Sequence, residues 1–154
     1  MWTPVNSMKY VFVCMGNTCR SPMAEAIMNA EIEKRRVLGV YAQSCGLMAF
    51  DGAPANELAV EAVKKYGVSL DFHSARRINA GILDGAIVLC MEKTLAEYVK
   101  SVYPDKKVFD LCAYAGMEGG ISDPYGMGQE TYDACADKIR RCIVNILTKA
   151  GRDK

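Results

Sequence analysis

A short apolar run that ends in a cysteine and leads straight into a glycine-containing turn constrains the fold more than any other feature. The run YVFVC, residues 10–14, is aromatic and β-branched apart from its cysteine, which is typical of a strand. The turn MGNTCRS follows, and Pro22 then opens a stretch with helical apolar spacing that ends in basic residues at 34–36, before Gly39. This order predicts a strand, a loop and a helix packed on that strand.

The same alternation of strand and helix continues along the chain. We predict further strands at residues 40–44, 86–90 and 107–111, and further helices within residues 53–67, 92–103 and 130–149, with Gly67 and Gly151 ending two of them. The unbroken apolar run AIVLC at 86–90 is expected of a strand that is covered on both faces. We therefore predict an α/β fold: one three-layer domain with a four-stranded parallel sheet and helices on both faces. Ligands in such folds bind beyond the carboxyl ends of the strands.

The length of 154 residues suits a single domain. Residues 1–7 have no periodicity and Met8 could itself be a start, so we interpret 1–7 as a loose N-terminal extension and 8–154 as the one domain. The connection at 116–128, GMEGGISDPYGMG, is rich in glycine and long enough to move.

Charge and cysteine content limit the possible partners and compartments. Nineteen basic and eighteen acidic side chains give a net charge of +1, so no overall field would hold a nucleic acid or an anionic membrane surface. The seven cysteines are an odd number, and they lack the paired C-x2-C spacing of a structural zinc site. No secretion signal precedes the first strand. These features favour the reducing cytoplasm, where thiols are catalytic or buried rather than bridged.

The loop after the first strand has the composition of a phosphate-binding loop. Gly16 and Asn17 both tolerate positive φ, so the loop can aim successive backbone N–H groups inward at an anion. The helix that begins near Ser21 adds its free N–H groups and its positive dipole end. Arg20 supplies a planar fork that binds two phosphoryl oxygens at once. This arrangement predicts a site for a tetrahedral dianion.

Cys14 lies at the base of the same loop. The loop N–H groups and the guanidinium of Arg20 favour its thiolate, which makes the sulfur a nucleophile near neutral pH. Ser21 is placed to donate a hydrogen bond to that sulfur and so to help it leave when a phosphocysteine intermediate breaks down. The alternative interpretation is that Cys14 is a buried structural cysteine. It does not explain why a serine, an arginine and a glycine turn follow at this spacing.

Four segments together resemble the low-molecular-weight protein tyrosine phosphatase family. They are VCMGNTCRSPMAE at 13–25, the stretch from Ser44 to Ile78, VLCME at 88–92 and DPYG at 123–126. The resemblance implies a cytoplasmic, metal-free enzyme without a cofactor, which acts on a phosphorylated protein and releases inorganic phosphate. It implies that Cys14 attacks phosphorus, Arg20 binds the phosphoryl group, and Asp123 protonates the leaving atom and then activates water. The substrate-binding residues that it implies are Met15, Gly16, Asn17, Thr18, Cys19 and Tyr125.

The sequence also supports Asp123 independently. Pro124 biases Asp123 toward an extended conformation, and the glycine-rich connection could bring it over Cys14. The competing interpretation is a turn-forming Asp-Pro pair in a solvated loop. A carboxylic acid used in this way must be protonated when the phosphoester or phosphoramidate breaks, so we expect a bell-shaped pH-rate profile.

The amino acid that carries the phosphoryl group depends on Thr18. By resemblance, tyrosine phosphatases of this family have isoleucine here, and the related bacterial protein arginine phosphatases have threonine, whose hydroxyl could hold a guanidinium. By the same resemblance, tyrosine phosphatases often have a second aromatic residue at position 126, whereas Gly126 matches the arginine-directed members. Tyr125 departs from the phenylalanine that is usual in those members. We therefore predict phosphoarginine in proteins as the substrate, with phosphotyrosine as the alternative.

Supporting residues are also implied by the resemblance. His73, the only histidine, is matched to a histidine that hydrogen-bonds with the loop residues Asn17 and Ser21 and with a serine that we match to Ser44. Cys19 lies five residues after Cys14, close enough in a tight loop for peroxide to drive a reversible disulfide between them, which the resemblance supports. The alternative for Cys19 is a small buried hydrophobe. We assign the remaining cysteines to packing: Cys45, Cys90, Cys112, Cys135 and Cys142.

Two other function classes compete with a phosphatase. Arsenate reductases share a similar loop, but they need further redox cysteines, and no suitable partner for Cys90 is evident. A non-catalytic phosphate-binding module would need neither the nucleophile nor the serine and the acid. The combination of Cys14, Ser21 and Asp123 favours the enzyme.

Overall fold

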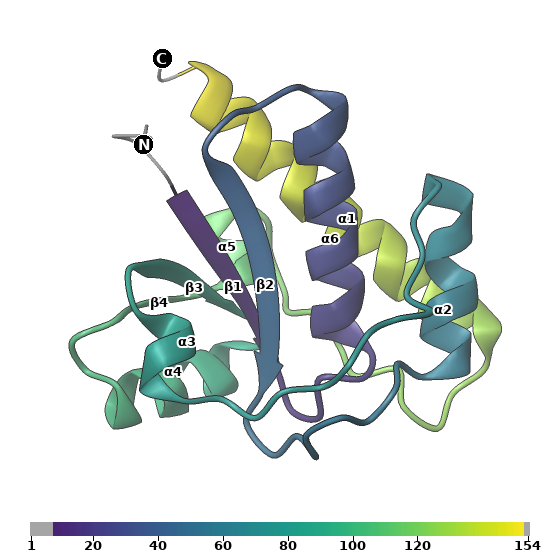
Figure 1. The fold of residues 1–154 in the computed structure, drawn as a ribbon, viewed down its shortest axis with the longest axis horizontal. Helices are drawn as coiled ribbons and strands as arrows, with labels where there is room; N and C mark the ends of the chain where they lie inside the picture. Colours follow the sequence, from purple (N-terminus) through teal and green to yellow (C-terminus); the bar gives the residue numbers. More distant parts are fainter. Residues whose placement is uncertain (1–7, 153–154) are drawn as a thin grey trace.

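The fold is built on a parallel sheet of four strands. The computed structural model describes residues 8–152. The strands are β1 (Met8–Cys14), β2 (Val40–Gly46), β3 (Ala86–Cys90) and β4 (Lys107–Asp110). They pair in the order β2-β1-β3-β4, and every pair is parallel. The predicted four-stranded parallel sheet is confirmed, and β1 lies inside it, between β2 and β3 (Figure 1).

Helices follow each strand. They are α1 (Arg20–Lys34), α2 (Glu57–Val63), which continues as a short 3-10 helix, η1 (Lys64–Tyr66), α3 (Ala80–Leu83), α4 (Lys93–Val102), α5 (Leu111–Tyr114) and α6 (Gln129–Arg152). Gly67 ends the α2–η1 segment at φ +75°, as its predicted position requires.

The two faces of β1 pack into two separate cores, because successive side chains of a strand point to opposite faces. Tyr10, Phe12 and Cys14 belong to a core with α1, α2 and α6. Val11 and Val13 belong to a smaller core with α3 and α4. Figure 1 shows these two groups of helices on opposite sides of the sheet. The three-layer arrangement is therefore confirmed, and Cys14 faces the layer that contains α1 and α6.

Some predicted boundaries are wrong, each for a local reason. Leu111 was expected to end the fourth strand but begins α5, because the Asp110 side chain accepts from the backbone N–H of Cys112 at 3.3 Å and caps a helix there. Residues 53–56 were expected in a helix, but Asn56 is the N-cap and α2 begins after it. Gly151 was expected to end the last helix, but α6 continues to Arg152. The short α3, capped by Asn79, has no apolar period and was not predicted.

The extension predicted at residues 1–7 lies outside the described residues. Among the helices that the structure describes, none is long and apolar enough to cross a membrane.

Candidate active site

The predicted loop follows β1, at the carboxyl end of one of the two inner strands of the sheet. Cys14 is the last residue of β1 and is paired with Gly46 of β2. Beyond the strands, the N–H groups of Leu47 and Met48 donate to the carbonyls of Cys14 and Met15 at 3.0 and 2.8 Å. The segment after β2 therefore holds the start of the loop by its backbone.

Cys14 is 2% exposed, and its sulfur has two polar neighbours. The Ser21 hydroxyl lies 2.9 Å from Cys14 Sγ, and the backbone N–H of Asn17 donates to the same sulfur at 3.3 Å. The contact predicted between the serine and the cysteine is therefore present. Hydrogen bonds of this kind stabilise a thiolate.

Asn17 holds the turn in a conformation that few residues adopt. Its φ is +56°, in the left-handed region. Its side chain donates to the hydroxyls of Ser21 at 2.8 Å and Ser44 at 3.0 Å, and its carbonyl lies 2.7 Å from Nε2 of His73. The structure thus brings the three supporting residues that the resemblance implied, Ser21, Ser44 and His73, into contact with Asn17.

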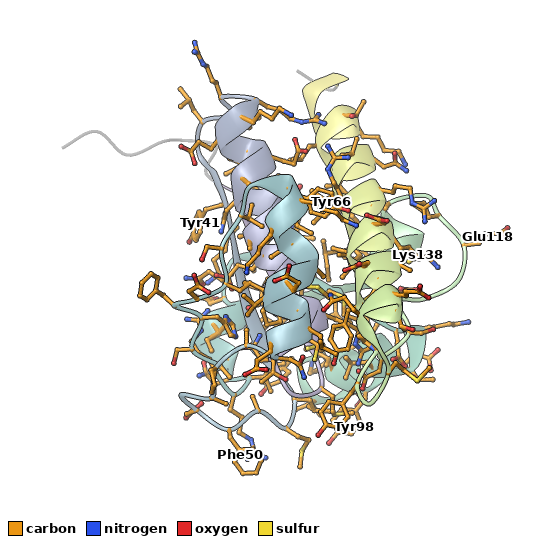
Figure 2. The ribbon with its side chains drawn as sticks, turned by 90° about the vertical axis from the view of Figure 1, so that its right-hand side faces the viewer. Tyr41, Phe50, Tyr66, Tyr98, Glu118 and Lys138 are labelled. Carbon is orange, nitrogen blue, oxygen red and sulfur yellow. The ribbon has the colours of Figure 1, made fainter. Side chains whose placement is uncertain are left out.

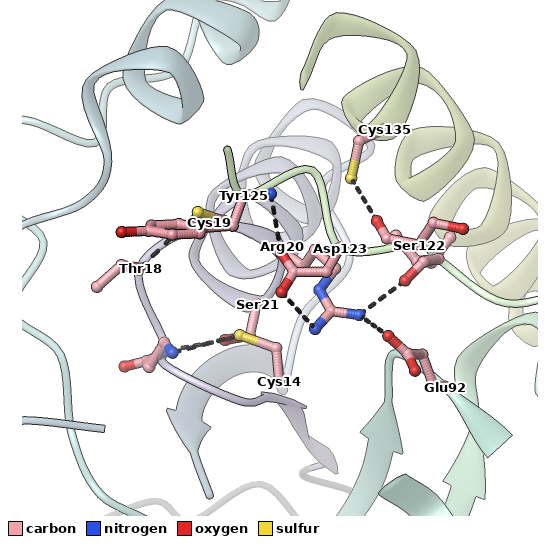
Figure 3. Close-up of polar contacts among 12 residues, drawn as sticks. Cys14, Thr18, Cys19, Arg20, Ser21, Glu92, Ser122, Asp123, Tyr125 and Cys135 are labelled. Carbon is pink, nitrogen blue, oxygen red and sulfur yellow. Dashed lines mark hydrogen bonds and ion pairs between the residues drawn. The ribbon is translucent and has the colours of Figure 1, made fainter. Parts of the chain in front are cut away.

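Arg20, the first residue of α1, is clamped by groups from two distant loops (Figure 3). Its Nη1 donates to Oε1 of Glu92, just after β3, and to the carbonyl of Ile121 at 2.8 Å. Its Nη2 lies 3.8 Å from Oδ2 of Asp123. The guanidinium is buried, with 5% of its side chain exposed, so these contacts fix its orientation.

Asp123 is half-exposed and lies beside the same guanidinium. Its Oδ1 accepts from the backbone N–H of Tyr125 at 3.0 Å, which closes the Asp-Pro turn on itself. The N–H of Ile121 donates to the carbonyl of Met91 at 2.9 Å and anchors the loop next to β3. The structure therefore brings Cys14, Arg20 and Asp123 into one site, as the motif predicted.

The remaining predicted residues surround this centre. Met15 and Tyr125 are exposed, Gly16 and Thr18 are half-buried, and Cys19 is buried. The carbonyl of Thr18 accepts from the N–H of Asn56 at 2.8 Å. In Figure 3, Thr18 lies on one side of Arg20 and Glu92 on the other.

The other thiols are buried and kept protonated. Burial raises the pKa of Cys19, whose sulfur lies 3.4 Å from the Tyr132 hydroxyl. Burial also raises the pKa of Cys45, Cys135 and Cys142 to about 12 each, and it raises the pKa of Cys90 and Cys112. The assignment of these last five cysteines to packing is confirmed by their burial. The predicted disulfide between Cys14 and Cys19 stays a prediction, since both are free thiols here.

Sequence reasoning missed several residues that contact the predicted ones. Glu92 binds Arg20, Glu25 accepts from the hydroxyl of Ser44 at 2.5 Å, and the backbone N–H of Arg76 donates to Asn17 Oδ1 at 2.9 Å. Glu92 follows a strand next to β1 and Glu25 ends the quoted motif, so both positions carried a signal. The guanidinium of Arg76 also donates to the carbonyl of Ser44 at 3.1 Å, but its bond to Asn17 comes from the backbone N–H, which any residue other than proline would supply.

Comparisons with known proteins agree with this geometry. The family model described as low molecular weight phosphotyrosine protein phosphatase matches residues 9–154. A protein-arginine-phosphatase of Bacillus subtilis is 32% identical over 152 residues, which are 96% of this chain and 99% of the relative. The crystal structure of a low molecular weight protein tyrosine phosphatase from T. tengcongensis is 39% identical, with a TM-score of 0.87 over 93% of this chain and 99% of that one.

A second similar structure shows a covalent state. It is a cysteine-to-serine variant of the arginine phosphatase YwlE with a phosphorylated active-site serine, 30% identical, with a TM-score of 0.87 over 96% of this chain and 98% of that one. The family model spans nearly the whole chain, and the fold matches that of the solved phosphatase structures. This protein belongs to the low molecular weight phosphotyrosine protein phosphatase family.

Proposed function

We propose that this phosphatase hydrolyses phosphoarginine in proteins through a phosphocysteine intermediate, with Cys14, Arg20 and Asp123 as its catalytic residues. The observation that carries the proposal is Thr18, a half-buried hydroxyl in the loop beside Cys14, where the resemblance assigns isoleucine to tyrosine phosphatases. A similar protein over almost the same length is named a protein-arginine-phosphatase.

In the first step the Cys14 thiolate attacks phosphorus, and the S–P bond forms as the bond from phosphorus to the leaving nitrogen breaks. Asp123 gives its proton to that nitrogen, so arginine leaves as a neutral group that then takes up a proton. The half-exposed position of Asp123 beside Arg20 lets it reach a phosphoryl group held on the loop.

In the second step Asp123, now a carboxylate, takes a proton from a water molecule that attacks the phosphocysteine. The P–S bond breaks, inorganic phosphate leaves, and the electron pair returns to Cys14 as a thiolate. The Ser21 hydroxyl, 2.9 Å from the sulfur, stabilises that leaving thiolate.

Arg20 stabilises the charge on the transferred group. Both hydrogens of its Nη1 are taken by Glu92 and Ile121, so Nη2 and Nε are the nitrogens left to bind phosphoryl oxygens in a bidentate manner. Preorganised donors of this kind act without reorganisation at the moment of reaction.

The loop around Asp123 also favours an arginine substrate. Gly126 has φ +82°, a conformation that L side chains rarely adopt, so the second aromatic residue that the resemblance assigns to tyrosine phosphatases would be strained here. The exposed Tyr125 is the feature that favours phosphotyrosine as the second candidate, because a phenol ring can stack on it.

We infer that the substrate is a protein segment and that the enzyme works in the cytoplasm. Exposed apolar side chains lie near the loop, including Met15, Met48 and Phe50, which stands at the lower end of the molecule in Figure 2. The seven unpaired thiols suit a reducing compartment. Inorganic phosphate, as product, is also the ligand expected on the loop.

Side-by-side rates on one peptide carrying phosphoarginine or phosphotyrosine test the proposal. We expect the parent to have the higher kcat/KM on phosphoarginine, and Thr18→Ile to shift the ratio toward phosphotyrosine by about tenfold. Cys14→Ser should lose turnover but still bind phosphate in calorimetry. A parent that prefers phosphotyrosine, with a ratio that Thr18→Ile leaves unchanged, would establish the alternative, and turnover by Cys14→Ser would rule out the mechanism.

A further inference from the structure

The hydrogen bonds around Asn17 have only one possible direction. The backbone N–H of Arg76 can only donate, and it lies 2.9 Å from Asn17 Oδ1, which fixes that atom as the carbonyl oxygen. The two hydrogens of Asn17 Nδ2 therefore point at the hydroxyl oxygens of Ser21 and Ser44, at 2.8 and 3.0 Å. Both hydroxyls accept from the same amide.

Each serine hydroxyl then has one hydrogen that it must donate to an acceptor other than Asn17. The Ser21 proton has Cys14 Sγ at 2.9 Å and, less favourably, the Cys45 carbonyl at 3.4 Å. The Ser44 proton has Oε1 of Glu25 at 2.5 Å. Among the described residues no other hydrogen bond takes the Ser44 proton, and Ser44 is only 1% exposed, so water does not replace Glu25.

Glu25 therefore accepts the remaining hydroxyl hydrogen, that of Ser44, in the hydrogen-bond network that ends at Cys14 Sγ. Without an acceptor, the Ser44 hydroxyl has to turn its proton toward the side-chain amide of Asn17. That proton then faces the N–H of Asn17, which otherwise donates to the Ser44 oxygen. Asn17 would then lose a partner that holds it at φ +56°. Two hydrogen bonds depend on that conformation: the one from the backbone N–H of Asn17 to Cys14 Sγ and the one from its side-chain amide to the Ser21 hydroxyl.

We propose that Glu25 is a positioning residue for the reaction at Cys14: it accepts the Ser44 proton and so holds Asn17 in the orientation that directs the Ser21 hydroxyl at the Cys14 sulfur. Glu25 is half-buried on the second turn of α1, on the same helix whose first residue is Arg20. The proposal rests on the cysteine chemistry of the proposed function but not on the choice between phosphoarginine and phosphotyrosine.

Two variants of similar size separate the acceptor from the rest of the side chain. Glu25→Gln keeps an oxygen that accepts from Ser44, whereas Glu25→Met fills the same space without one. We expect Glu25→Met to lower kcat/KM on p-nitrophenyl phosphate about tenfold, and Glu25→Gln to stay within about threefold of the parent. Glu33→Met, at an exposed position of the same helix, is the control and should behave as the parent.

A readout that needs no turnover reports on the sulfur itself. The initial rate of alkylation by iodoacetate at pH 6.5, with the adduct located on Cys14 by mass spectrometry, should fall in Glu25→Met by a similar factor and be largely retained in Glu25→Gln. Because this reaction involves no phosphoryl substrate, its result does not depend on the proposed activity.

A double-mutant cycle with Ser44→Ala completes the test. If Glu25 acts through the Ser44 proton, Glu25→Met has no further effect on alkylation once Ser44→Ala has removed that proton. Three results would each overturn the proposal. They are an alkylation rate of Glu25→Met equal to that of the parent, a fall in rate for Glu25→Gln as large as for Glu25→Met, and an undiminished fall in rate when Glu25→Met is added to Ser44→Ala. The double variant also keeps the test valid should Glu25→Met alone fold poorly, because it leaves no buried hydroxyl proton without an acceptor.

Discussion

The guanidinium of Arg20 has more protein partners than binding phosphate requires. Two of them, Glu92 and Ile121, lie after β3 and in the Asp123 loop, and both bind Nη1. A side chain with several rotatable bonds is thereby ordered before the substrate arrives, which lowers the entropy lost on binding. The carboxylate of Glu92 also offsets the cost of burying the cation.

Replacing Glu92 tests this ordering. Glu92 is 41% exposed, so solvent screens the pair, and we expect Glu92→Ala to cost about 1 kcal/mol of transition-state binding, or about a fivefold fall in kcat/KM. The inhibition constant of inorganic phosphate should rise in parallel, because the same nitrogens bind product. Steady-state kinetics measure both, with Glu97→Ala on the exposed side of α4 as the control. Parent-like values for Glu92→Ala would mean that the other partners, Ile121 and Asp123, are enough to hold Arg20.

Residues within one loop were easier to predict than residues that meet across the fold. Cys14, Arg20 and Ser21 lie on one strand-loop-helix unit, so their spacing alone indicated an anion site. Asp123 lies on a distant loop, and its Asp-Pro pair alone was equally compatible with a solvated turn, so the resemblance to a family was needed to favour it. Glu92 lies 72 residues from its partner Arg20, and only the pairing of β3 with β1 brings the two together.

The end of β2 shapes the loop after β1. Gly46, the last residue of β2, is paired with Cys14, and a Cβ there would lie 2.8 Å from the backbone nitrogen of Asn17 and 2.9 Å from the carbonyl oxygen of Met15. These are backbone atoms, which cannot move aside as a side chain does. The nitrogen is also the one that donates to Cys14 Sγ.

We therefore expect Gly46→Ala to displace the loop. The displacement should lower the free energy of unfolding by about 1–3 kcal/mol, and kcat/KM on p-nitrophenyl phosphate should fall more than tenfold because the bond to the sulfur is lost. Urea unfolding and steady-state rates are the measurements. Gly128→Ala, where a Cβ meets nothing within 4 Å, should change the unfolding free energy by no more than about 0.5 kcal/mol. A Gly46→Ala protein as stable and active as the parent would contradict this account.

The four strands and the four long helical segments followed from apolar period and turn residues. The four-residue helices α3 and α5 did not, because each depends on one capping side chain, Asn79 or Asp110, rather than on a repeated pattern. Propensity signals need several residues to accumulate. The start of α2 was misplaced for the same reason, since Asn56 caps it three residues after the expected first residue.

Seven free thiols are distributed through both cores of the molecule. The sequence positions of five of them indicated packing, and the burial of all seven follows from the two-sided sheet. The consequence for stability did not follow from sequence, because it depends on how completely each sulfur is removed from water. The pKa of Cys45, Cys135 and Cys142 is raised from the ordinary value of 9.0 to about 12, with burial as the largest cause.

These raised pKa values predict how stability depends on alkaline pH. Between about pH 9 and 12 the unfolded chain has lost these thiol protons while the folded chain keeps them, so stability falls as pH rises, by up to about 1.4 kcal/mol per pH unit for each thiol. Below pH 9 both states are protonated and the full contribution is present. The urea midpoint under reducing conditions, measured from pH 7 to 10.5, should be flat at first and then decline.

Comparison with Cys45→Ala isolates one thiol, because every other titrating group is shared with the parent. The variant starts less stable, since it leaves a small cavity beside Val13 and Cys90 in the α4 core. Its unfolding free energy should nevertheless decline with pH less steeply than that of the parent. Above pH 9 the two slopes should differ by the contribution of one thiol, up to about 1.4 kcal/mol per pH unit. Parallel pH profiles for the two proteins would show that Cys45 ionises as readily in the folded state as in the unfolded chain, and that its burial does not protect its proton.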